Sequence, residues 1–161
     1  MEPTAGTGAK GARTRRAILE AAIARFGRDG YRATKVADIA RDAAVGGTVA
    51  YAYFDGKEAL FLAALDEDAA AVIAEGLSTV AGAAGPLDWG DELVLTWVAA
   101  LDRHPLARRV LSGLEPEVTD RINHIPAMEE LRKAAAERLA ADQAAGLLRA
   151  DVDPAAMARG A

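Results

Sequence analysis

The sequence predicts an all-α protein. Alanine and leucine dominate it, aromatic residues make up only 5%, and strand-like alternation of apolar and polar residues is hard to find. Apolar residues instead recur every three or four positions, as on one face of a helix. At 161 residues the chain is long enough for one domain with a full core, or for two small domains that share an interface.

Composition excludes several classes of protein. The absence of cysteine rules out disulfides, thiolate metal sites and cysteine nucleophiles. The first sixteen residues lack the apolar core of a signal peptide, and the longest purely apolar runs, such as 69–74, are far too short to span a bilayer. We therefore expect a cytoplasmic protein with no membrane partner.

Charge is divided unevenly along the chain. The net charge is −5, but residues 1–60 hold 10 Lys/Arg against 7 Asp/Glu, whereas residues 61–161 hold 9 against 17. A basic first part followed by an acidic second part is typical of a protein that binds a phosphate-bearing partner with its basic end. Chance clustering on a solvated surface is the alternative, because the N-terminal excess is small.

The helical pattern predicts a flexible tail over residues 1–12 and a series of helices after it. Thr34 is the expected N-cap of the second helix, and the Gly-rich stretch 79–86 is expected to break the long helix that begins at Lys57. The predicted helices cover residues 13–28, 36–43, 47–53, 57 to beyond 72, 88–101, 105–114, 126–148, and a last one that starts at Pro154.

Two short helices near the N-terminus, at 36–43 and 47–53, suggest a helix-turn-helix. On a helical wheel Gly47, Thr48, Tyr51 and Ala52 share one arc, which carries two hydroxyl groups and no bulky aliphatic side chain. Such a face is poor core, but it suits contact with phosphates and base edges. Lys57, at the start of the next helix, adds a cation beside that helix's free N–H groups.

The residues Thr34-Lys35-Val36-Ala37-Asp38-Ile39-Ala40, then Tyr51-Ala52-Tyr53-Phe54 and Lys57-Glu58-Ala59-Leu60, carry a specific resemblance. This stretch resembles the DNA-binding domain of the TetR family of transcriptional regulators, and Phe26, Gly30 and Tyr31 match the end of the family's first helix. The resemblance covers about residues 13–65. It implies a three-helix DNA-binding domain there, and a helical domain for ligand binding and dimerisation over residues 66–161.

The resemblance also implies which residues meet DNA. Gly47 and Thr48 fall on base-facing positions, Tyr51 and Tyr53 on base- or phosphate-contacting ones, and Lys57 on the family's phosphate-binding lysine. Thr34 and Lys35 fall at a helix start that meets the DNA backbone. Half-buried packing remains the alternative for both tyrosines and an ordinary surface role for Lys57, while Phe26, Val36, Ile39 and Phe54 are expected in the core.

The chain departs from the family pattern in the turn. Ala44 stands where the family usually has glycine, and Gly46 where it often has serine. An ungapped register is preferred to one slipped by a residue, because an insertion would rotate the reading face by about 100°. Arg13, Arg15 and Arg16 are expected either to form an arm on DNA or to remain a solvated basic tail.

Catalytic and nucleotide-binding motifs are absent. Lys57 follows a glycine, but Glu58 and Tyr51 stand where a P-loop requires Ser/Thr and glycine. His104 and His124 are far apart and form no nucleophile–base set, so that we expect no enzyme, no cofactor and no metal site.

The C-terminal part is expected to bind an apolar effector, as the resemblance implies for this family. Either a pocket or ordinary core explains the apolar residues Trp89, Leu93, Trp97, Leu101, Leu111, Leu114 and Met128. Two further helices that form the dimer interface usually follow the DVDP region, and the sequence ends at Ala161, a turn or two into the first. A homodimer on a palindromic operator is therefore expected on the resemblance alone.

Two hypotheses follow. The first is a sequence-specific DNA-binding transcriptional repressor that a small-molecule ligand releases from its double-stranded DNA operator. The second, from another class, is a helical small-molecule-binding or protein-interaction module without DNA readout.

Overall fold

The computed structural model describes residues 5–80 and 88–159, and within these ranges it contains helices and no strands. The all-α prediction is confirmed. The helices are α1 (Ala5–Ala33), α2 (Val36–Asp42), the 3₁₀ helix η1 (Val49–Ala52), α3 (Lys57–Val80), α4 (Asp88–Ala100), α5 (Pro105–Leu111), α6 (Thr119–Ile122), α7 (Pro126–Ala144) and α8 (Pro154–Arg159).

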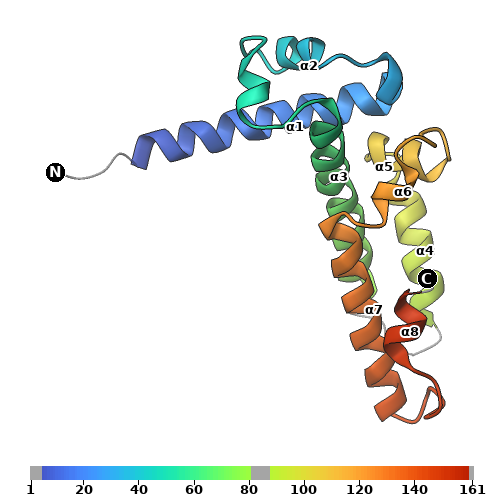
Figure 1. Ribbon diagram of the computed structural model, residues 1–161. Helices are drawn as coiled ribbons and strands as arrows, with labels where there is room; N and C mark the ends of the chain where they lie inside the picture. The colour runs from blue at the N-terminus through green and yellow to red at the C-terminus, as the bar shows by residue number, and fades with distance from the viewer. Residues whose placement is uncertain (1–4, 81–87, 160–161) are drawn as a thin grey trace.

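Two groups of helices meet at the C-terminal end of α1. Figure 1 shows α1 lying across the top of α3, with α2 and η1 above it, while α3, α4 and α7 run side by side below. The small helices α5 and α6 lie between the lower group and the end of α1. The element that joins the two groups along the chain is therefore α3, and α5 is packed against both α1 and α3.

The long α1 differs from the prediction at both ends. It begins at Ala5 rather than Arg13, so that residues 5–12 continue the helix where a tail was expected. Near its C-terminus Gly30 adopts φ 82° and ψ 171°, a left-handed conformation that breaks the helix and that glycine reaches at little cost. The buried hydroxyl of Thr34 donates to the Gly30 carbonyl at 2.7 Å and so fixes this kink.

The core of the N-terminal group is built as predicted. Phe26, Val36, Ile39 and Phe54 are all buried, with at most 7% of each residue exposed. Phe26 also packs edge-on against Phe61 of α3, with ring centroids 5.0 Å apart. The aromatic contact makes α3 part of the N-terminal core, and the orientation of the N-terminal domain thus depends on α3.

The position of α2 is set by an ion pair as well as by the core. Arg25 of α1 donates to both oxygens of Asp42 at the end of α2, at 2.5 and 2.9 Å. The hydrogen bonds from Arg25 lower the pKa of the Asp42 carboxyl, despite partial desolvation in the opposite direction. This forked pairing holds α2 against α1 in a defined orientation.

No helix in the described part of the chain is long and apolar enough to cross a bilayer.

Candidate DNA-binding surface and effector pocket

The turn after α2 contains an unusual backbone conformation. Ala44 has φ 54°, in the left-handed region that side chains with a Cβ rarely adopt. The Val45 amide donates to the Ala40 carbonyl at 2.9 Å and closes the turn. In this turn Ala44 therefore adopts the conformation of the position at which the TetR family usually has glycine.

The expected α-helix over residues 47–53 is replaced by the 3₁₀ helix η1. Its backbone bonds run from Val49 to Gly46 and from Tyr51 to Thr48, at 2.9 and 3.2 Å. Glycine disfavours a helix by about 1 kcal/mol relative to alanine, and two glycines precede this element. The only buried residues of the segment 46–54 are Ala50 and Phe54, so little packing is available to extend it.

Gly47 and Thr48 directly precede η1 and Tyr51 belongs to it, and we refer to these three residues as the η1 face. All three are exposed, and Tyr51 retains 57% of its surface. The face combines two hydroxyl groups with a backbone that has no side chain at residue 47. Hydroxyl groups bond either to phosphate or to base edges, and the glycine permits close approach of a ligand.

The other residues expected to contact DNA are placed differently. Lys35 is exposed at the start of α2, whereas Thr34 is 1% exposed and holds the kink of α1. The N-cap prediction for Thr34 is wrong, since Lys35 occupies that position without a side-chain bond to the helix. Tyr53 is half-buried, and its hydroxyl lies 3.7 Å from the point where Gly11 would carry a Cβ.

Lys57 is the first residue of α3, and its ammonium group contacts the end of α1. The Nζ atom donates to the Arg32 carbonyl at 3.2 Å and lies 4.5 Å from the centre of the Tyr31 ring. A cation over an aromatic face is attracted by the ring quadrupole, so that the Tyr31 ring and the Arg32 carbonyl together hold the ammonium in place. This support could not be foreseen from the sequence, because Tyr31 and Lys57 meet only when α1 is folded onto α3.

Arg15 also lies near η1, with its guanidinium 5.2 Å from the centre of the Phe54 ring. Arg16, by contrast, pairs with Glu20 on the exposed side of α1 at 2.9 Å. Arg15 and Arg16 are adjacent in sequence, but the structure points them to different neighbours, and Arg15 is the one that lies near η1.

Charged residues of the C-terminal part bind the end of α1 and the start of α3. Glu115 is 6% exposed, and its carboxylate accepts the Tyr31 amide and the Arg109 guanidinium. Two ion pairs also join the N-terminal group to this part of the chain: Arg32, at the end of α1, pairs with Glu117, and Glu58, at the start of α3, pairs with Arg121. None of these contacts could be foreseen from the sequence, since no periodic or local pattern marks them.

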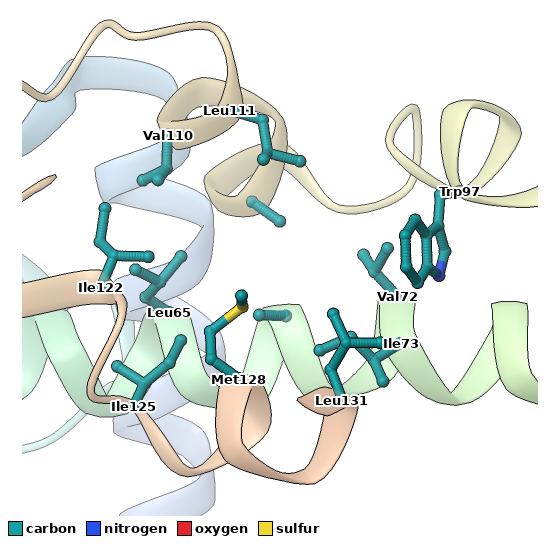
Figure 2. Close-up of a pocket in the computed structure, with 12 residues that line it drawn as sticks. Leu65, Val72, Ile73, Trp97, Val110, Leu111, Ile122, Ile125, Met128 and Leu131 are labelled. Atoms are coloured by element: carbon teal, nitrogen blue, oxygen red, sulfur yellow. The ribbon is translucent and has the colours of Figure 1, made fainter. Parts of the chain in front are cut away.

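An apolar pocket of about 240 Å³ lies between α3, α5 and α7. None of its lining side chains carries an oxygen or a charge (Figure 2). The lining residues are Leu65, Ala69, Val72, Ile73, Trp97, Ala107, Val110, Leu111, Ile122, Ile125, Met128 and Leu131. Such a pocket suits a ligand, or part of one, that is itself apolar.

The residues expected to bind an effector are divided between several places. Trp97, Leu111 and Met128 line the pocket, and Leu93 is buried beside it, against Gly76. Leu101 and Leu114 border a separate, more polar hollow that also contains Arg108 and Arg109. The side chain of Trp89 lies outside the described residues. The α3 residues of the lining were missed because their apolar run is equally typical of core.

Comparison with known proteins agrees with this arrangement. Residues 18–64, which contain the turn and η1, match the family of bacterial regulatory proteins of the tetR type. No curated protein matches the chain in sequence.

Solved structures match over most of the chain. FadR from Bacillus halodurans, a regulator of fatty acid degradation, has a TM-score of 0.72 at 22% identity, over 91% of this chain and 77% of its own. FadR from Bacillus subtilis, solved with stearoyl-CoA, has a TM-score of 0.70 at 21% identity, over 90% and 81%. A protein studied for the control of antibiotic production by bacterial hormones has a TM-score of 0.66 at 28% identity, over 91% and 78%.

The fold and the matched domain define the class: a DNA-binding transcriptional regulator with an N-terminal helix-turn-helix domain and a helical C-terminal domain. Within that class, residues 18–64 match the DNA-binding region of the TetR family, and the chain as a whole shares the fold of solved regulators of that family.

Proposed function

We propose that this regulator is a homodimeric repressor that leaves a palindromic operator when an apolar small molecule binds in the pocket. The observation that carries the proposal is the position of α5. Val110 and Leu111 of this helix line the pocket, while the preceding Arg109 is bonded to Glu115, which accepts the Tyr31 amide of the DNA-binding domain. A ligand that displaces α5 therefore acts directly on the end of α1.

The pocket chemistry supports an effector with an apolar body. The lining offers no charge and no hydrogen-bonding oxygen, so that a charged or strongly polar group inside it would lose its hydration without compensation. Among similar structures, one FadR was solved with stearoyl-CoA and another protein is a γ-butyrolactone receptor. An acyl chain or a comparable hydrocarbon is thus the part of the effector that we assign to the pocket.

Selection of bound duplexes from a random DNA pool tests the DNA-binding function. Enrichment of a palindrome, with affinity that falls steeply as salt rises, supports the proposal, and no enrichment at low salt contradicts it. Tyr51→Ala and Lys57→Ala should weaken binding of the selected duplex. Leu147→Ala and Lys133→Ala are the matched controls, because these exposed side chains lie far from η1.

The effector is tested by filling the pocket. Ala69 lines it, whereas the adjacent Ala70 is exposed on the same helix. Compounds with acyl or aromatic hydrocarbon bodies should have two effects on the wild-type protein: they should raise its melting temperature, and they should release it from DNA. Ala69→Phe should abolish both effects and keep DNA binding, and Ala70→Phe should change neither.

A binding module without DNA readout is the second candidate, favoured by the reduction of the expected reading helix to the single 3₁₀ turn of η1. The same selection separates the two, since this candidate requires that no duplex be enriched while apolar compounds still bind.

A further inference from the structure

His104 lies between two carboxylates of α3, just before α5 begins. Its Nδ1 is 2.8 Å from Asp68 Oδ1, and its Nε2 is 3.1 Å from Glu75 Oε1. A neutral imidazole has one N–H group, and a carboxylate can only accept. Both contacts are therefore hydrogen bonds only when His104 is protonated, and loss of the proton leaves one ring nitrogen facing a carboxylate oxygen.

The two carboxylates are held to different degrees. Asp68 is 4% exposed and also accepts the amides of Leu106 and Ala107, at 3.0 and 2.9 Å, at the start of α5. Glu75 is partly exposed and is also paired with Arg103. Deprotonation of His104 should therefore release the Glu75 contact first, because Asp68 is fixed to the backbone of α5.

The charged surroundings of His104 favour the proton. From α3 the groups that face the ring are Asp68 and Glu75, and from its own segment Arg103 lies on Glu75. On the side of α1 packed against the start of α5 lies Gly27, which brings no charge to the ring. The packing there is so close that a Cβ added to Gly27 would lie 2.7 Å from the Pro105 Cβ. Burial lowers the pKa of His104, but the hydrogen bonds to Asp68 and Glu75 outweigh burial and raise it above the ordinary value.

This cluster does not line the apolar pocket, but its neighbours along α3 and α5 do. Ala69 and Val72, which follow Asp68 on α3, line the pocket together with Ala107 of α5. Val72 and Ala107 also belong to a small buried cluster with Ala100, directly beside the His104 segment. The bonds that tie His104 to α3 therefore hold two walls of the pocket together.

We propose that protonation of His104 locks α5 against α3 and keeps the pocket from widening, so that the pocket admits apolar ligands more readily once the proton is lost. The inference rests on the proposed function in one respect, that this pocket is the effector site. By linkage, a ligand that widens the pocket should also release a proton from His104.

The experiment uses the neutral fluorescent probe N-phenyl-1-naphthylamine, titrated into the protein between about pH 5.5 and 9. Wild-type affinity should rise about 3- to 10-fold over this range. His104→Gln should bind with the same affinity at every pH, and Glu75→Gln, a change at a partly exposed residue, should move the transition to lower pH. His124→Gln is the matched control, because His124 is the other histidine and is exposed.

Nuclear magnetic resonance titration of the histidine ring protons, assigned with the same variants, should place the His104 transition at the midpoint of the affinity change. Wild-type affinity that does not depend on pH, a pH dependence that persists in His104→Gln, or no probe binding at any pH would each overturn the inference. Ala69→Phe should abolish the signal and so show that the probe occupies the pocket. Failure to select DNA would refute the repressor and leave this proton linkage standing.

Discussion

The carboxylate of Glu115 accepts the backbone amide of Tyr31, with 3.2 Å from that nitrogen to each carboxylate oxygen, across 84 positions of sequence. The amide is available because Gly30 breaks α1 immediately before it. Arg109, the partner of Glu115 in an ion pair, precedes two residues of the pocket. One buried carboxylate thus connects the DNA-binding domain to the wall of the apolar pocket.

Glu115→Ala should lower the free energy of unfolding by about 2–4 kcal/mol, because it leaves a partly buried guanidinium and a backbone amide without their acceptor. Glu117→Ala is the control, because Glu117 pairs with Arg32, whose side chain is 85% exposed. This substitution should change the free energy of unfolding by less than about 1 kcal/mol. Urea denaturation of both variants measures the difference. Equal effects would show that burial of Glu115 has no energetic consequence.

Gly76→Ala should destabilise the protein although alanine is the better helix former. A Cβ on Gly76 would lie 2.1 Å from Trp97 Nε1 and 2.8 Å from Leu93 Cδ1, so that the indole must move. We expect a loss of about 1–3 kcal/mol, with a change in tryptophan fluorescence and in the pocket that Trp97 lines.

Gly8→Ala is the matched control, because nothing lies within 4 Å of the Cβ it would add to α1. It should leave stability unchanged or raise it by a few tenths of a kcal/mol, roughly as helix propensity predicts. A Gly76→Ala variant as stable as this control would contradict the packing of Trp97 against α3.

Helix starts were predicted better than helix ends. The starts at Pro105, Pro126 and Pro154 are confirmed, because proline fixes a helical φ and lacks the amide that a first turn leaves unbonded. The ends of α5 and α7 were placed too late. α5 and α7 stop at Leu111 and Ala144, just before Gly113 and Gly146 turn into the left-handed region, at φ 70° and 75°.

The site was predictable where it depends on local pattern. The η1 face is exposed, as the wheel of small and hydroxyl-bearing residues suggested, although the wheel assumed an α-helix. Contacts between distant segments were not predictable, since neither Glu115 nor Asp68 belongs to a motif. Thr34 shows the same limit, because its burial depends on the kink at Gly30, which periodicity does not reveal.

Ala44→Gly should stabilise the protein by about 0.5–1 kcal/mol. A Cβ in the left-handed region costs about 1–2 kcal/mol, and the greater entropy of glycine in the unfolded chain removes part of the gain. Ala43→Gly is the control, since Ala43 has an ordinary φ of −76° and should lose stability instead. Thermal unfolding compares the pair, and a loss of stability in Ala44→Gly would contradict the conformation of the turn.

The stability of the wild type should fall as pH rises through the pKa of folded His104. That pKa is raised by Asp68 and Glu75 against the opposing effect of burial, whereas an unfolded histidine titrates near about 6.5. The stabilisation is therefore complete below the unfolded value and is lost above the folded one. Urea denaturation at a series of pH values should show this decline in the wild type and in His124→Gln.

His104→Gln should remove the decline and cost about 1–3 kcal/mol at low pH, where two charge-assisted hydrogen bonds are lost, and much less at high pH. The wild-type and His104→Gln curves should therefore converge as pH rises. Parallel curves would mean that His104 remains in one protonation state throughout, and that its contacts with α3 are structural without responding to pH.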